Sequence, residues 1–200
     1  PEQGVPFIPH DEILSFEELE RLVTIFCDLG VSKIRVTGGE PFSRRGCMPF
    51  LERLRKIRGV ERLHITTNGV RTLQFLDDLA AISIDGINLS LDTLEPERFR
   101  TISRRDYLDA VLETLDGIIK RGIPLKINSV VLEDTTDAEI RRLAALPEKL
   151  PVSLRFIELM PFSGKRCSSA LATGNLVRRL QNIFPELTEC ATDQPTTARI

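Results

Sequence analysis

The chain has 200 residues, of which 42% are hydrophobic and 28% are charged, proportions typical of a globular protein with one sizeable core. Its formal net charge of -2 and pI near 5.8 give no global reason to expect a nucleic-acid partner. No apolar run approaches the roughly 20 residues that span a bilayer, and no secretory signal is visible, so we expect a cytoplasmic protein without a membrane partner.

Predicted helices and strands alternate along the chain. Ser15 is predicted to cap the first helix, with Glu18 as its capping-box partner, and Gly30 is predicted to end it. A strand begins at Lys33, and further strands are predicted at residues 62–67, 87–91, 125–132 and 153–159. The later helices are predicted at residues 47–58, 73–81, 107–121, 137–146 and 171–183. Strands that alternate with helices at this spacing predict parallel βα units.

Two adjacent glycines, Gly38 and Gly39, end the strand that begins at Lys33, and Pro41 prevents the strand from continuing. Because glycine has no Cβ, this turn can bring a ligand close to the main chain. The turn lies at the carboxyl end of a strand that leads into a helix, which is where ligands sit in α/β folds. The alternative is that the glycines only shape a tight turn, which is the more frequent case for an isolated Gly-Gly pair.

One face of the predicted sheet is polar along four strands. Its polar residues alternate with apolar ones and are Lys33, Arg35 and Thr37, Thr66 and Asn68, Asn88, Ser90 and Asp92, and Lys126 and Asn128. A complete eight-stranded barrel is packed with branched apolar side chains, so a polar interior predicts a curved, incomplete TIM-type barrel that holds polar ligands and water. For any single residue, the alternative is a buried polar group with an internal partner.

Arg35 and Lys126 are cations predicted to point into this interior, where a charge is costly without an anionic partner. One explanation is internal ion pairs, for which the candidate partners are Asp92, Glu40 and Glu158. The other explanation is an anionic ligand such as a phosphorylated nucleotide, because arginine suits bidentate phosphate contacts and lysine supplies a point charge. Spacing alone does not separate the two explanations.

No catalytic group is evident in the residues themselves. Ser90 suits hydrogen bonding, but neither His10 nor His64 is predicted near enough to activate it as a nucleophile. The four cysteines are scattered at spacings that suggest neither a zinc site nor an iron–sulfur site: Cys27, Cys47, Cys167 and Cys190. We therefore predict no metal site and no catalytic residue in this chain, and expect the chemistry on a cofactor or on residues outside it.

The chain resembles the radical S-adenosylmethionine (SAM) enzymes, and among them the GTP cyclases of molybdenum cofactor biosynthesis. The resemblance runs from about Pro1 to Gly164, and its motifs are specific in their order and spacing. These motifs are Pro1-Glu-Gln-Gly-Val5, Lys33-Ile-Arg-Val-Thr-Gly-Gly-Glu-Pro41, Thr66-Thr-Asn-Gly69, Ile87-Asn-Leu-Ser-Leu-Asp-Thr-Leu94, Lys126-Ile-Asn128 and Arg155-Phe-Ile-Glu-Leu-Met-Pro161. The chain departs from the family at Gly46, where members usually carry an acidic residue.

The resemblance implies a GTP 3',8-cyclase, a radical SAM lyase that uses SAM and 4Fe-4S clusters to convert GTP into the cyclic pterin precursor of molybdenum cofactor. It implies that SAM is bound by Gly38, Gly39, Ser90 and Met160. It also implies that GTP is bound by Arg35, Thr66 and Lys126. The cluster cysteines of the family have no counterpart here, so the resemblance places them outside this chain and implies that the chain alone is inactive.

From this resemblance we expect residues 1–164 to form a partial radical SAM barrel without its first strand. We expect residues 165–200 to form a helix and the start of a truncated C-terminal region. A sheet edge without its first strand invites pairing with another chain, so two copies are expected to associate. The alternatives are a radical SAM enzyme with a different substrate and a non-catalytic nucleotide-binding barrel, and a C-x-x-x-C-x-x-C motif upstream would exclude the second of these.

Overall fold

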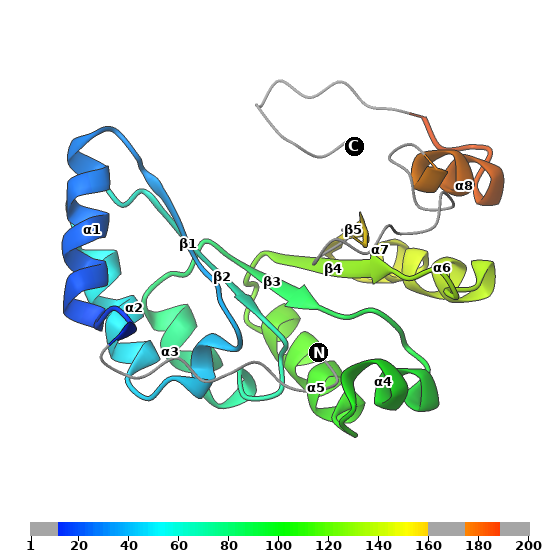
Figure 1. The fold of residues 1–200 in the computed structure, drawn as a ribbon, viewed down its shortest axis with the longest axis horizontal. Coiled ribbons are helices and arrows are strands. Elements are labelled where there is room, and N and C mark those ends of the chain that lie inside the picture. The colour runs from blue at the N-terminus through cyan, green and yellow to red at the C-terminus, as the bar shows by residue number, and fades with distance from the viewer. Residues whose placement is uncertain (1–11, 160–174, 189–200) are drawn as a thin grey trace.

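The computed structural model describes residues 12–159 and 175–188. Their centre is a parallel sheet in which each strand pairs with the next strand along the chain, in the order β1-β2-β3-β4-β5 (Figure 1). The strands are β1 (Lys33–Val36), β2 (Arg62–Thr67), β3 (Gly86–Ser90), β4 (Leu125–Val131) and β5 (Val152–Glu158). The predicted α/β fold of parallel βα units is therefore confirmed, as a partial TIM-type barrel whose described strands form an open sheet.

Helices lie between consecutive strands and cover one face of the sheet, and further helices lie before β1 and after β5 (Figure 1). They are α1 (Phe16–Asp28), η2 (Pro41–Ser43), α2 (Cys47–Lys56), η3 (Leu73–Phe75), α3 (Leu76–Ala81), α4 (Pro96–Ser103), α5 (Leu108–Lys120), α6 (Asp137–Ala144), α7 (Leu146–Lys149) and α8 (Asn175–Ile183). The predicted capping box begins α1: the Ser15 amide donates to Glu18 Oε2 at 2.7 Å, and the Glu18 amide donates to Ser15 Oγ at 3.1 Å.

Two helical segments differ from the sequence prediction. The pattern does not predict α4, because Phe99 and Ile102 are its only large apolar side chains. The helix predicted at residues 137–146 ends at Ala144, and a separate α7 follows with Pro147 in its first turn. The predicted boundary between residues 164 and 165 lies outside the described residues.

The hydrophobic core lies between the apolar face of the sheet and the helices. The strand residues Leu63, Ile65, Ile87, Leu89 and Ile127 all have 0% exposure. They belong to one cluster with the helix residues Leu51, Leu54, Leu76, Leu79, Val111 and Ile118. Each buried side chain of this kind stabilises the fold by about 1.5–3 kcal/mol relative to full exposure. Because the core uses one face of the sheet, the opposite face is left for polar side chains.

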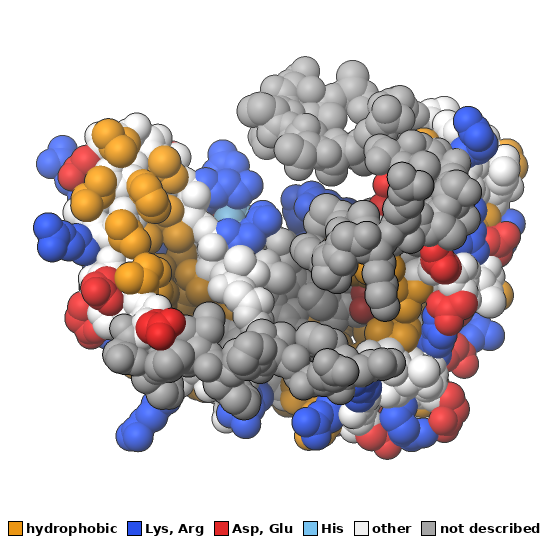
Figure 2. Space-filling view, in the orientation of Figure 1, with side chains coloured by type: hydrophobic (Ala, Val, Ile, Leu, Met, Phe, Trp, Pro, Cys, Tyr) orange, Lys and Arg blue, Asp and Glu red, His pale blue; other side chains and the backbone are white. Residues whose placement is uncertain are grey.

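The outer side of α1 carries exposed apolar side chains, which gather in orange over this helix in Figure 2. Leu22, Ile25 and Phe26 are among them, and Leu29, which caps the end of the helix, is 77% exposed. Next to this helix, β1 pairs only with β2 among the described strands. The association of two copies through this region stays a prediction. No helix in the described parts of the chain is long and apolar enough to cross a bilayer.

Candidate functional site

The polar side chains of the sheet lie in rows on the face opposite the helices, which we call the polar face. The strand register places Thr66 beside Asn88, and Asn88 beside Lys126. Asn88 Nδ2 lies 3.5 Å from Thr66 Oγ1, at the limit of a hydrogen bond. The predicted residues Thr66 and Lys126 therefore lie in one row of the polar face, separated by a single strand.

The other predicted residues lie in the rows on either side of the row that contains Thr66 and Lys126. Toward the carboxyl ends of the strands, Ser90 pairs in register with Asn128, and Asn128 with Arg155. Toward the amino ends, Arg35 pairs with His64. Because side chains on one face of a strand recur every second residue, Arg35 lies one row away from the row of Thr66 and Lys126.

Four cations of the polar face have no acidic partner in the described part of the chain. Lys33, Arg35, Lys126 and Arg155 take part in none of the ion pairs formed there. Figure 2 shows blue Lys and Arg side chains beside the pale blue of histidine in the central hollow. Cations that lie together without carboxylates form a site that attracts an anion.

The three carboxylates that were candidate partners bind backbone amides instead. Asp92 Oδ1 accepts a hydrogen bond from the Val130 amide at 2.8 Å. Glu158 Oε1 accepts one from the Leu176 amide at 3.3 Å. Glu40 accepts hydrogen bonds from the amides of Phe42 and Asn68. Internal ion pairs among the described residues therefore do not explain the cations of the polar face, of which Lys33, Arg35 and Lys126 are exposed and thus accessible to an anionic ligand.

The ionisation of two groups reflects this excess of positive charge. Burial lowers the pKa of the Lys126 ammonium, and Arg155, Lys33 and Arg35 lower it further. Burial also lowers the pKa of the His64 imidazole, and Lys33 and Arg35 add to this effect more than Asp85 opposes it. A bound anion would counteract the effect of the neighbouring cations and so raise both pKa values.

The Gly38–Gly39 turn lies at the carboxyl end of β1 and is open toward solvent. Gly38 has a φ of +152°, a backbone angle that side chains disfavour. A Cβ added to either glycine would meet no atom of the described residues within 4 Å. These residues therefore leave the space in front of the backbone open and do not shape the turn by crowding, and the binding of a ligand there stays a prediction.

Glu40 joins this turn to the end of β2. Its Oε2 accepts a hydrogen bond from the Asn68 amide at 2.8 Å, and its Oε1 accepts one from the Phe42 amide at 3.2 Å. The Thr67 hydroxyl lies 2.9 and 3.0 Å from the two carboxylate oxygens. Because Thr67 Oγ1 donates to Glu40, it accepts from the Gly69 amide at 3.0 Å and from the Thr72 hydroxyl at 2.7 Å. One carboxylate thus holds two loops at the carboxyl ends of the strands.

A cavity of about 590 Å³ opens above these loops. Its lining includes Glu40, Asn68, Ser90, Asp92, Phe99 and Tyr107. Ser90, predicted as a cofactor residue, is exposed to this cavity, whereas the predicted residue Met160 lies outside the described residues. The cavity joins the predicted Ser90 to α4, whose Phe99 supplies an apolar wall.

The described cysteines are structural. Cys47 is buried in the core, and burial, followed by the charge of Glu40, raises the pKa of its thiol to about 11. Cys27 is half-buried, and both thiols are free. No group of three or more His, Cys, Asp or Glu side chains in residues 12–159 and 175–188 is arranged to hold a metal ion.

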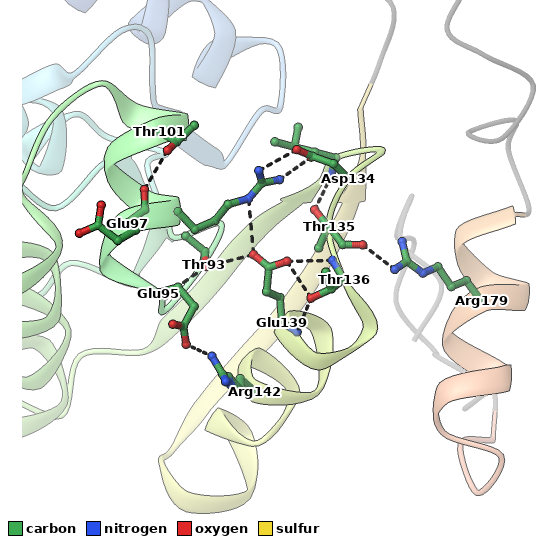
Figure 3. Close-up of polar contacts among 12 residues, drawn as sticks. Thr93, Glu95, Glu97, Thr101, Asp134, Thr135, Thr136, Glu139, Arg142 and Arg179 are labelled. Carbon is green, nitrogen blue, oxygen red and sulfur yellow. Dashed lines mark hydrogen bonds and ion pairs between the residues drawn. The ribbon is translucent and has the colours of Figure 1, made fainter.

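A polar network holds α4, and with it one wall of the cavity, against α6 and the loop that joins β4 to α6 (Figure 3). Glu139 accepts from the amide and hydroxyl of Thr136, at 2.8 and 2.9 Å, and thereby completes the capping box of α6. Thr93 Oγ1, in the segment between β3 and α4, lies 3.5 Å from Glu139 Oε1. Arg98 of α4 lies 3.5 Å from the same oxygen and also pairs with Asp134.

Replacing Glu139 by alanine should lower the free energy of unfolding by about 2–3 kcal/mol, since it removes a helix cap and the partner of a half-buried arginine. Glu139 is 12% exposed and Arg98 is 22% exposed, so water replaces the lost contacts only in part. Urea unfolding would measure the change. The matched control is Glu113→Ala at an exposed position of α5, for which we expect less than about 0.5 kcal/mol. Equal effects in the two variants would contradict the role of the network.

His64, Lys33 and Arg155 belong to the polar face, although the residues alone do not identify them as functional. The signal for Lys33 and His64 is their spacing, because each precedes a predicted ligand, Arg35 or Thr66, by two residues on the same face. Arg155 becomes part of the site only through the pairing of β5 with β4.

The chain matches the model of the radical SAM superfamily over residues 3–146. It is 41% identical over 162 residues to a GTP 3',8-cyclase of Heliobacterium modesticaldum, which covers 80% of this chain and 50% of that protein. It is 43% identical over 163 residues to a GTP 3',8-cyclase of Thermodesulfovibrio yellowstonii, and this match covers 80% of this chain and 51% of that protein. Molybdenum cofactor biosynthesis protein 1 of Bos taurus is 36% identical over 202 residues, covering 100% and 32%. The chain thus spans about half the length, or less, of these curated relatives.

Solved structures share the fold at low sequence identity. SuiB of Streptococcus suis bound to S-adenosylmethionine superposes with a TM-score of 0.67 at 20% identity, covering 84% of this chain and 39% of that one. Native anSMEcpe with bound AdoMet gives a TM-score of 0.67 at 18% identity, and the match covers 89% of this chain and 52% of that one. These likenesses extend to the partial barrel as a whole. Since the family match covers well over half of its residues, the chain belongs to the radical SAM superfamily.

Proposed function

We propose that the chain is the SAM- and nucleotide-binding part of a GTP 3',8-cyclase, which converts GTP into the cyclic pterin precursor of molybdenum cofactor. The observation that carries this proposal is the set of cations without acidic partners on the polar face, next to an open glycine turn. The names of the relatives support it over a radical SAM enzyme with another substrate.

The open glycine turn and the cavity fit SAM. Gly38 and Gly39 leave free space where a Cβ would lie, so their backbone can contact the methionyl part of the cofactor. Glu40 and Asp92 line the cavity with carboxylates, which suit the positive charge of SAM, and Ser90 offers a hydroxyl there. Met160 is proposed as a fourth contact. SAM, when bound beside an iron–sulfur cluster, supplies the radical chemistry, and these residues orient it.

The polar face fits the nucleotide. Arg35 and Lys126 would neutralise the phosphate chain, and Thr66 would hydrogen-bond to the same ligand from the strand between them. The side chains of Arg35 and Lys126 are exposed on the same face of the sheet, so an anion can reach both. We further propose that residues 1–164 form this binding unit, and that residues 165–200 begin the next region of the protein.

GTP binding measured by calorimetry tests the proposal. Lys126→Ala should weaken GTP binding by roughly 10- to 100-fold, since a hydrogen bond to a charged group contributes about 1.5–3 kcal/mol. The matched control is Lys56→Ala, which removes the same charge from an exposed position on α2 in the helical layer. Equal GTP affinities in the Lys126→Ala variant and the unmodified protein would contradict the assignment, and so would equal affinities for GTP and for a pyrimidine nucleotide.

A further inference from the structure

His64 lies at the centre of β2 on the floor of the polar face, one row below Thr66. It lines a second cavity of about 180 Å³ at the amino ends of the strands. Asn88, Lys126 and Ser153 line the same cavity from β3, β4 and β5, respectively. The imidazole therefore faces the same space as the lysine that we assign to the nucleotide.

One nitrogen of this imidazole has no partner. His64 Nε2 is buried and makes no hydrogen bond with any described residue. An unpaired buried polar atom costs about 1–3 kcal/mol, and native structures contain few of them. On the other side of the ring, a Cβ at Gly86 would approach Nδ1 to 3.0 Å, so the glycine leaves room for the ring where it lies. A ligand in the cavity is the remaining candidate partner for Nε2.

The charges around His64 are almost all positive. Arg62 precedes it on the same face of β2, and the other cations that face it are Lys33 and Arg35 from β1 and Lys126 from β4. Among the described residues, the acidic group that acts on His64 is Asp85, which already accepts hydrogen bonds from Arg55 Nη1 at 2.8 Å and from the Leu63 amide at 2.7 Å. Without an anion nearby, these surroundings keep the imidazole neutral at pH 7.

We propose that His64 binds a phosphate oxygen of the nucleotide through Nε2, beside Arg35 and Lys126, and that it takes up a proton as it does so. This inference rests on the proposed function and adds to it a phosphate-binding residue whose charge depends on pH. The bound phosphate raises the pKa of the ring above its value in the free protein. Binding is therefore coupled to proton uptake, and affinity increases as the pH falls through the pKa of the complex.

Nuclear magnetic resonance can follow this proton directly, because the chain has only two histidines, His10 and His64. The ring signals would be titrated with and without inorganic triphosphate as the probe, and then with GTP. We expect triphosphate to raise the pKa of His64 and to leave His10 nearly unchanged. Equal shifts of both histidines, or no shift of His64 at saturating triphosphate, would overturn the inference.

The affinity of variants provides the second measurement. His64→Gln keeps a hydrogen-bond donor that does not titrate, so it also reports how far protonation of triphosphate itself alters binding. Relative to this variant, the unmodified protein should gain about tenfold or more in affinity from pH 8 to pH 6, and His64→Leu should bind less tightly than both at pH 6. The same pH dependence in the unmodified protein and His64→Gln would contradict the role of His64.

The two proposals fail in different ways. GTP binding that depends on Lys126 but leaves the His64 signal unchanged would contradict only the inference about His64. A His64 response to triphosphate without any preference for GTP over a pyrimidine nucleotide would contradict only the assignment of GTP as substrate.

Discussion

Replacing Gly69 by alanine is expected to lower the free energy of unfolding by about 2–5 kcal/mol. Gly69 follows β2 with a φ of +83°, which costs an alanine about 1–2 kcal/mol. The added Cβ would lie 2.7 Å from Leu89 Cδ1 and 3.3 Å from Val111 Cγ1, and overpacking of this kind costs about 1–3 kcal/mol. Leu89 and Val111 are both fully buried, so neither can move aside freely.

The backbone of Gly69 cannot move away either. Its amide donates to Thr67 Oγ1 at 3.0 Å, and its carbonyl accepts from Thr114 Oγ1 at 2.7 Å. Urea unfolding would measure the loss of stability. Gly30→Ala is the matched control, since Gly30 has a φ of +95° but no atom within 4 Å of its added Cβ. The control should cost only the backbone contribution, and equal losses in the two variants would show that crowding by Leu89 and Val111 is unimportant.

Replacing Glu40 by alanine is expected to cost about 2–4 kcal/mol and to loosen the cavity rim. The change removes the acceptor of the Phe42 and Asn68 amides and of the Thr67 hydroxyl. A hydrogen bond to a charged group contributes about 1.5–3 kcal/mol, and water recovers part of this at the exposed amide of Asn68. Because the same carboxylate connects the Gly38–Gly39 turn to β2, the turn should lose its fixed position.

Hydrogen exchange together with urea unfolding would test this expectation. The amides of Phe42 and Asn68 should exchange faster in the Glu40→Ala variant, beyond the change caused by lower global stability. Glu61→Ala is the matched control, because Glu61 is exposed and its carboxylate forms no hydrogen bond among the described side chains. Unchanged exchange at Phe42 and Asn68 would mean that other contacts hold the turn.

Much of the fold follows from local patterns. The alternation of strands and helices predicts the parallel sheet, and the period of two along each strand predicts its polar face, because a strand sends successive side chains to opposite sides. Ser15 and Glu18 are a further example, since a capping box depends only on residues three positions apart.

The arrangement of the site depends on contacts that the sequence does not reveal. The strand register places Arg35 beside His64 rather than beside Thr66. The alternation of polar and apolar residues fits either pairing, so it cannot predict which one forms. The helix α4 was not predicted because its apolar side chains are few, although its Phe99 forms a wall of the cavity. A short polar segment becomes a helix here because the network around Arg98 holds it in place.

The choice between ion pairs and an anionic ligand likewise needed the tertiary structure. By residue type, Asp92 and Glu158 are candidate partners of Lys126 and Arg35, yet each accepts a hydrogen bond from an amide of another element. Backbone amides carry no signature in a sequence, so residue types alone left both explanations open.

The order of the strands has a consequence for how the chain folds. Each strand pairs with its nearest neighbour in the sequence, as Lys33 does with Arg62 and Leu125 with Val152. Every pairing among the described strands therefore closes a loop of moderate length, and none of these five strands waits for a partner distant in the sequence. During synthesis each new βα unit can dock on the one already formed. From β1 to β5, the surface that gathers the cations is thus assembled in the order in which the residues leave the ribosome.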